Sequence, residues 1–159
     1  MGAGMKISIF VKMFPPKRLG GTEIATFNIA KHLSKRHEVH VFTTLDEGLP
    51  RESYIEGFYV HRVPWPNIRF LGGLLFLINI ARFLKKIKPD IIHIQNIEFG
   101  KNIFLINKLL RKPYVIWARG SDVNFLDMNE NDWILKQALI NADAVISLTE
   151  DMKNNGISM

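Results

Sequence analysis

Short apolar segments alternate with amphipathic segments along the chain, and this alternation predicts strands and helices in turn. Residues 6–12 form an apolar run that is typical of a buried strand. Residues 22–36 repeat apolar positions every three or four residues, which predicts a helix. Further strands are expected at 37–44, at 58–63 within the stretch 54–63, and at 91–95, 114–118 and 142–147. Further helices are expected at 68–88, 99–112, 129–141 and from 149 onward. Residues 45–53, which include Gly48 and Pro50, are expected to form a loop.

Strands that alternate with helices predict an α/β fold in which helices cover both faces of a mostly parallel sheet. We expect a Rossmann-like, doubly wound sheet of about six or seven strands in the order 3-2-1-4-5-6, because crossovers between parallel strands are right-handed. This order places the first and fourth strands side by side. Ligands of doubly wound sheets bind beyond the carboxyl ends of the strands at this point.

The length and composition indicate one domain with a substantial core, because the chain has 159 residues and is 47% hydrophobic. Cysteine is absent, so the sequence offers neither a disulfide nor a thiolate metal ligand, which fits a reducing compartment. Residues 1–4 precede a second methionine, Met5, and look like a remnant added for expression. We therefore expect residues 5–159 to form a single domain.

The net charge of +6 makes nucleic acid, anionic lipid and phosphorylated small molecules candidate partners. The basic residues are spread along the chain, and no nucleic-acid-binding motif is present. We therefore interpret most of them as a solvated surface and expect no nucleic-acid partner.

The helix expected at 68–88 is the most apolar one, yet its apolar run is too short to span a bilayer. Two interpretations stay open: a helix packed within the domain, or an interfacial helix whose basic end, with Lys85, Lys86 and Lys88, lies at a membrane surface. A dimer contact is a further alternative. The N-terminus shows no signal-peptide pattern, so we expect a cytoplasmic protein, with peripheral contact at the inner face of the membrane as the alternative.

The stretch 14–24 connects the first strand to the first helix. Pro15 and Pro16 prevent regular pairing, and Gly20 and Gly21 remove side chains where the helix begins. The first N–H groups of a helix lack internal partners and carry partial positive charge, so this geometry suits an anion. An ordinary strand–helix connection is the alternative interpretation.

Polar residues also follow the later strands, at the same expected edge of the sheet. They are His93, Gln95, Asn96, Arg119, Gly120, Ser121, Asp122, Thr149 and Glu150. His93 and Gln95 share one face of their strand, because strand side chains alternate. His93 is interpreted either as a core histidine or as a catalytic group.

The residues after the fifth and sixth strands allow two interpretations each. Arg119 suits phosphate or sugar hydroxyls, or else forms a salt bridge with Asp122 or Glu98. Asp122 either accepts a proton or a hydroxyl hydrogen bond, or holds its own turn. Thr149 and Glu150 are either ligand contacts or a plain helix start.

Several known site patterns are absent from the sequence. There is no G-x-x-x-x-G-K-[ST] and no G-x-S-x-G. There is also no H-E-x-x-H and no D-x-D, so no metal site is expected. No G-x-G-x-x-G follows the first strand. Asp46 does follow the second strand, at the position where an acidic residue would bind the ribose of a nicotinamide cofactor. A nicotinamide cofactor is therefore still an alternative.

The ordered set of short motifs resembles the N-terminal domain of a family-4 retaining glycosyltransferase with the GT-B architecture. The motifs are Pro-Pro-x-x-x-Gly-Gly-x-Glu at 15–23, His-Glu-Val-His-Val-Phe-Thr at 37–43, Lys-Pro-Asp-Ile-Ile-His-Ile-Gln at 88–95, Pro-Tyr-Val-Ile-Trp-Ala-Arg-Gly-Ser-Asp at 113–122 and Ala-Asp-Ala-Val-Ile-Ser at 142–147.

The resemblance implies two facing Rossmann-like domains with the active site between them. The N-terminal domain would hold the acceptor, and the C-terminal domain most of the nucleotide-sugar donor, with no required metal or other cofactor. The loop at Gly20 and Gly21 would approach the donor diphosphate, and Arg119 to Asp122 would face the transferred sugar. The candidate catalytic residues are Arg119, Asp122 and His93, and the candidate substrate-binding residues are Gly20, Gly21, Glu23, Gln95, Asn96, Gly120, Ser121, Thr149 and Glu150.

Two departures from the family pattern leave the donor sugar open: Arg119 and Gln95 stand where many members carry histidine. The chain also lacks a donor domain, so we expect a truncated fragment that has no transferase activity by itself. The alternative function is a non-catalytic Rossmann-like module that binds a nucleotide or a protein.

Overall fold

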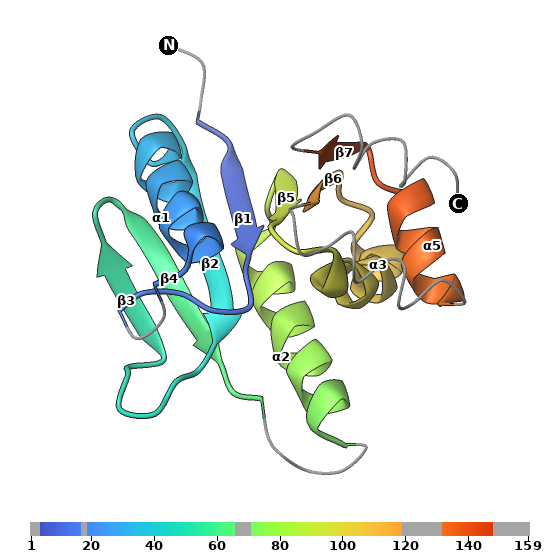
Figure 1. Cartoon of the computed structure of the whole chain (residues 1–159), viewed down its shortest axis with the longest axis horizontal. Helices are drawn as coiled ribbons and strands as arrows, with labels where there is room; N and C mark the ends of the chain where they lie inside the picture. The colour runs from blue at the N-terminus through green and yellow to red at the C-terminus, as the bar shows by residue number, and fades with distance from the viewer. Residues whose placement is uncertain (1–3, 17–18, 66–70, 119–131, 148–159) are drawn as a thin grey trace.

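The computed structural model describes residues 4–16, 19–65, 71–118 and 132–147. These contain a seven-stranded sheet in the order β3-β4-β2-β1-β5-β6-β7 (Figure 1). All neighbouring strands are parallel except β3 and β4. The elements are β1 (Lys6–Phe10), α1 (Gly21–Leu33), β2 (Glu38–Thr44), β3 (Glu52–Ile55), β4 (Phe58–Val63), α2 (Leu71–Ile87), β5 (Ile91–Ile94), α3 (Ile97–Leu110), β6 (Tyr114–Ala118), α5 (Trp133–Ile140) and β7 (Ala144–Ser147).

The predicted strand order is confirmed. The six expected strands correspond to β1, β2, β4, β5, β6 and β7, and they lie in the order 3-2-1-4-5-6. β1 pairs with β2 on one side and with β5 on the other. The direction of winding therefore reverses between β1 and β5, as in a doubly wound sheet.

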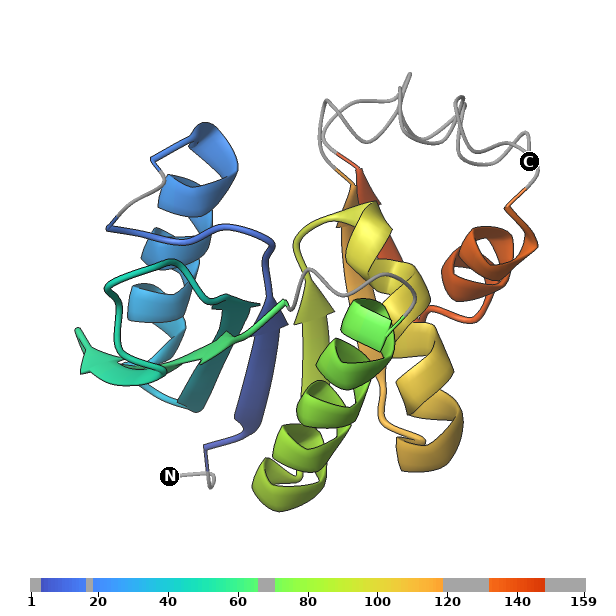
Figure 2. The same ribbon diagram turned by 90° about the horizontal axis from the view of Figure 1, so that it is seen from below.

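Helices cover both faces of the sheet (Figures 1 and 2). On one face, α1 packs with Phe14 over the apolar side chains of β1, β2 and β4. On the other face, α2, α3 and α5 pack over β1, β5 and β6. Burial on both faces explains why β2 is almost wholly buried, including the polar positions of its alternating sequence.

The third expected strand is confirmed as β4, but the sequence did not predict β3, the strand that precedes it. Residues 54–63 contain the end of β3 and all of β4, which pair antiparallel through Ile55 and Phe58. Between them Glu56 and Gly57 have φ values of 49° and 93°, which is the positive-φ pair of a two-residue hairpin turn. β3 also begins at Glu52, inside the segment expected to be a loop.

Replacing Gly57 with alanine is expected to lower the free energy of unfolding by about 1–2 kcal/mol, because a side chain is strained at this φ. The new Cβ would also lie 2.9 Å from the Ser34 hydroxyl oxygen. Urea denaturation of the chain measures the loss. The matched control is Gly73→Ala in α2, where a Cβ meets no atom within 4 Å. This control should gain about 0.5–1 kcal/mol, and equal stability of both variants would contradict the account.

Helix ends differ from the expected ones by a few residues, and local backbone accounts for several of them. α2 and α3 end just before Lys88 and Arg111, which both have positive φ. α5 begins after Asp132, whose carboxylate accepts a hydrogen bond from the Leu135 N–H at 3.0 Å. Asn129 and the helix expected from Thr149 lie outside the described residues.

Candidate functional site

The carboxyl ends of β1 and β5 lie next to each other, as the strand order required. Phe10 is opposite Ile94, and the Gln95 N–H donates to the Phe10 carbonyl at 2.8 Å. The loop with Gly20 and the residues after β5 therefore leave the same edge of the sheet. This edge is where ligands bind in doubly wound sheets.

The glycine pair lies at the start of α1. Gly20 is the extended N-cap residue, and a Cβ added at Gly21 would meet no atom within 4 Å. At Gly20 a Cβ would collide with the Glu23 carboxylate, so this side chain folds over the first turn of the helix. A carboxylate is stabilised at a helix N-terminus, and an incoming phosphate would have to displace it. The ligand-binding roles of these three residues stay predictions.

His93 and Gln95 share one face of the sheet, as expected from the alternation along β5. The His93 ring lies parallel to the Trp117 ring, at 5.9 Å between centroids. The Gln95 side chain is fully buried, and its amide nitrogen lies 3.4 Å from the His93 ring nitrogens. These contacts hold His93 in place, but they do not test a catalytic role.

Asn96 occupies the N-cap position of α3 without capping the helix through its side chain. Its side-chain oxygen is buried and has no hydrogen-bond partner within the described ranges. Arg119, Gly120, Ser121, Asp122, Thr149 and Glu150 lie outside the described residues. The strands that precede them, β6 and β7, lie beyond β5 in the sheet.

A cavity of about 420 Å³ opens beyond the carboxyl ends of β1 and β2, toward which the arrow of β1 points in Figure 1. Its walls come from both strand ends, from the segment after β4 and from the start of α3. The lining residues are Lys12, Met13, Thr44, Asp46, Trp65, Phe99 and Asn102. Among them, only Asp46 is a candidate ligand-binding residue from the sequence, and only for a ribose. Their positions just after strand ends are the signal that could have identified others.

The cavity combines aromatic and polar walls. Trp65 is 51% exposed, and its ring lies 4.6 Å from the buried Phe76 ring, which supports it from below. Lys12, Asp46 and Asn102 add an amine, a carboxylate and an amide. Sugars present an apolar ring face and several hydroxyls, so this combination is suited to a carbohydrate.

Hydrogen bonds fix the backbone around the cavity. The Thr43 and Thr44 hydroxyls both donate to the Lys12 carbonyl, at 3.1 and 2.7 Å. The Arg62 guanidinium donates to the Pro50 carbonyl and to the Ser53 hydroxyl, which tethers the loop after β2. Burial lowers the pKa of Arg62, and the negative charge of Asp46 opposes this shift.

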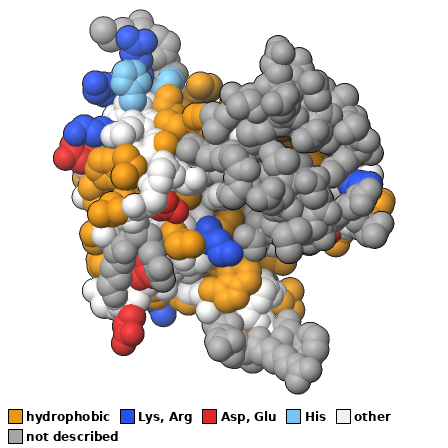
Figure 3. All heavy atoms as spheres, in the orientation of Figure 1, with side chains coloured by type: hydrophobic (Ala, Val, Ile, Leu, Met, Phe, Trp, Pro, Cys, Tyr) orange, Lys and Arg blue, Asp and Glu red, His pale blue; other side chains and the backbone are white. Residues whose placement is uncertain are grey.

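Charge and metal-ligand geometry add little to this site. Figure 3 shows Lys, Arg and His side chains gathered over the C-terminal end of α1, with no continuous basic stripe among the described residues of that face. No three His, Cys, Asp or Glu residues of the described ranges are placed to hold a metal ion.

Within the same ranges, no helix has the length and apolar character needed to cross a membrane.

Comparisons with known proteins agree with the fold. The family model of Glycosyltransferase Family 4 matches residues 19–158. Similar solved structures include sucrose-phosphate synthase from Thermosynechococcus elongatus (TM-score 0.75, 15% identity, 94% of this chain and 44% of that chain). Another is Anabaena HepE in complex with UDP-glucose (TM-score 0.71, 16% identity, 97% of this chain and 40% of that chain). A third is the lipopolysaccharide outer core galactosyltransferase WaaB (TM-score 0.66, 18% identity, 97% of this chain and 42% of that chain).

The chain spans well under half the length of these three structures. A sequence comparison with curated proteins found none that matches. The family match covers most of the chain, and the structural likeness covers nearly all of it. The chain belongs to glycosyltransferase family 4 and has the fold of the N-terminal half of a GT-B enzyme.

Proposed function

We propose that the chain is the acceptor-binding half of a retaining glycosyltransferase, which moves a sugar from a nucleotide-sugar donor to a hydroxyl group. The family membership supports the reaction class. Structures of the similar Anabaena HepE hold UDP-glucose or UDP with glucose, which supports a nucleotide-sugar as the donor. Retention is carried over from the resemblance.

The observation that carries the acceptor role is the cavity beside Lys12, Asp46 and Trp65. In the proposed complex a sugar ring of the acceptor lies against Trp65. Its hydroxyls bind the Asp46 carboxylate and the Asn102 amide. Exclusion of water by the aromatic wall strengthens these polar contacts.

The donor side of the proposal uses the glycine pair and the residues after β5 and β6. Glu23 turns away from the α1 N-terminus, and the donor diphosphate approaches Gly20 and Gly21. Helix N-termini and basic residues stabilise the leaving diphosphate. Arg119 and Asp122 face the transferred sugar, and His93 completes the proposed catalytic set.

The proposed division of the site is tested by a turnover assay with UDP-glucose and a panel of other nucleotide-sugars. We expect the 159-residue chain alone to give no product, because half of a shared site cannot orient both substrates. A protein that joins this chain to a second Rossmann-like domain should turn over. Product formed by the chain alone would contradict the proposal. No turnover by the joined protein would favour the non-catalytic binding module.

We also propose that α2 lies on an anionic membrane surface, where a lipid-linked acceptor would be met. Leu71, Leu74, Leu75 and Ile78 are 38–53% exposed and follow one stripe of the helix. The basic Lys85 and Lys86 lie in the last turn. An apolar stripe that continues into basic residues is typical of an interfacial helix.

The membrane proposal is tested by sedimentation with phosphatidylglycerol vesicles. Leu74→Glu should weaken binding by about tenfold or more, because a buried leucine contributes about 1.5–3 kcal/mol. The matched control is Leu109→Glu on α3, because Leu109 is 86% exposed and lies outside the stripe. Equal binding by the two variants would contradict a specific role for α2.

A further inference from the structure

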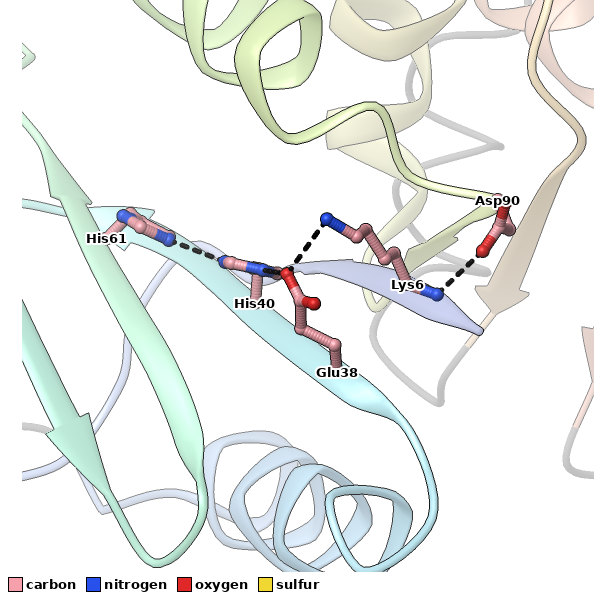
Figure 4. Close-up of polar contacts among 5 residues, drawn as sticks. All are labelled: Lys6, Glu38, His40, His61 and Asp90. Atoms are coloured by element: carbon pink, nitrogen blue, oxygen red, sulfur yellow. Dashed lines mark hydrogen bonds and ion pairs between the residues drawn. The ribbon is translucent and has the colours of Figure 1, made fainter. Parts of the chain in front are cut away.

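Four side chains form a continuous polar row across the β3–β4–β2 edge of the sheet, on the face covered by α2 (Figure 4 shows three of them). Glu38 lies 2.9 Å from Nε2 of His40, whose Nδ1 lies 2.9 Å from Nε2 of His61. Nδ1 of His61 lies 3.2 Å from Glu52. The two histidines are only 6% and 8% exposed.

The three contacts of the row determine how many hydrogens the ring nitrogens of His40 and His61 carry. Each of the three contacts needs one hydrogen, and a carboxylate supplies none. The hydrogens facing Glu38 and Glu52 therefore belong to the rings, and the contact between the rings needs a third. Two neutral imidazoles carry only two ring hydrogens, and two imidazolium ions carry four. Only one extra proton, shared by the pair, satisfies all three contacts.

Packing holds the two rings in this line. Their planes differ by 15°, so they lie almost edge to edge. The Tyr59 ring stacks on His40 at 4.9 Å, and the Phe42 ring stacks on His61 at the same distance. Phe83 of α2 contacts the His61 ring from above, at 5.1 Å between centroids. Neither ring can turn to another partner without disturbing these contacts.

The surrounding charges favour one extra proton and oppose a second. Glu38 and Glu52 attract positive charge at the two ends of the row, whereas Lys6, 3.3 Å from Glu38, and Lys86 of α2 repel it. The pKa of His61 is lowered, first by burial and then by the charge of His40, while Glu52 opposes the shift. The hydrogen bond from His40 lowers the pKa of Glu38, which stays a carboxylate.

We propose that His40 and His61 share a single extra proton at neutral pH and act as a pH-sensitive clasp, which ties the β3–β4 hairpin to the central sheet beneath α2. The clasp is complete only with three ring hydrogens. A fourth hydrogen places two N–H groups against each other, and the loss of one leaves a carboxylate or a ring nitrogen without a donor.

The clasp makes the free energy of unfolding of the chain depend on pH. Unfolded histidines titrate near pH 6.5, at about the value of model peptides. The folded pair binds a second proton less readily than two unfolded histidines do. Its contribution to the free energy of unfolding is therefore present above this pH and is lost as the pH falls.

The hydrogen count is measured by ¹⁵N NMR of the histidine rings in the ¹⁵N-labelled 159-residue chain at pH 7. We expect three ring N–H groups on His40 and His61 together, whereas a count of two or four overturns the proposal. No variant is required, so this measurement does not depend on a substitution that folds.

A second measurement follows the urea midpoint between pH 5 and pH 9. His61→Gln should remove most of the pH dependence below pH 6.5, whereas the control His32→Gln, at an exposed position of α1, should keep it. Equal pH dependence of the two variants overturns the clasp. If His61→Gln does not fold, the hydrogen count of the unmodified chain decides.

Discussion

Replacing Trp65 with alanine is expected to raise the acceptor KM of the proposed transferase by about 10- to 100-fold, because truncation of a central aromatic contact typically costs that much binding energy. Trp65 is half exposed at the mouth of the cavity and is supported by Phe76. The donor KM should change little, since the donor binds elsewhere in the proposed site. Steady-state kinetics with either substrate varied separate the two effects.

Two further variants make this result specific. Trp65→Phe keeps an aromatic face and should recover much of the affinity for the acceptor. Tyr54→Ala removes another exposed aromatic ring, from β3 at the outer edge of the sheet, and should leave both KM values unchanged. Trp65→Ala with an unchanged acceptor KM, or with equal changes in both KM values, would show that this residue does not hold the acceptor.

Replacing Phe42 with alanine is expected to lower the free energy of unfolding by about 3–5 kcal/mol, the usual cost of a buried Phe-to-Ala cavity. Phe42 is 1% exposed, and its ring stacks on Phe10 at 4.8 Å. It also contacts the rings of His61 and Phe83, at 4.9 and 5.8 Å. One side chain therefore joins β1, β2, β4 and α2.

Urea denaturation gives this loss directly. Phe42→Leu, which keeps most of the apolar volume, should cost less than half as much as the alanine variant. A loss below about 1 kcal/mol for Phe42→Ala would mean that the core can close around the gap, contrary to the packing described here.

The strand order could be predicted because it depends on few rules. Apolar runs alternate with helical patterns, and right-handed crossovers leave few arrangements for such a chain. β3 was missed because it has only four residues, Glu52–Ile55, and its turn to β4 is only Glu56 and Gly57. A two-residue turn interrupts the alternation of apolar and polar positions too briefly to be recognised in a short segment.

The site was only partly predictable. Gln95 and Asn96 could be placed at this edge of the sheet because they follow a recognisable strand, but the cavity takes Lys12, Asp46 and Trp65 from three separate segments. None of these residues belongs to a motif, so only their positions in space bring them together. His40 occupies a polar position of an alternating sequence, which is typical of an exposed residue, but α2 covers that face of the sheet and His40 is buried.

The most direct test of the account maps the acceptor on the chain itself. An acceptor that the complete enzyme glycosylates is added to the ¹⁵N-labelled chain at several times its KM, and backbone amide shifts are recorded. The account predicts saturable shifts centred on Lys12, Asp46 and Asn102. Saturable shifts centred on another surface, or none at that concentration, would contradict the assignment of this cavity to the acceptor.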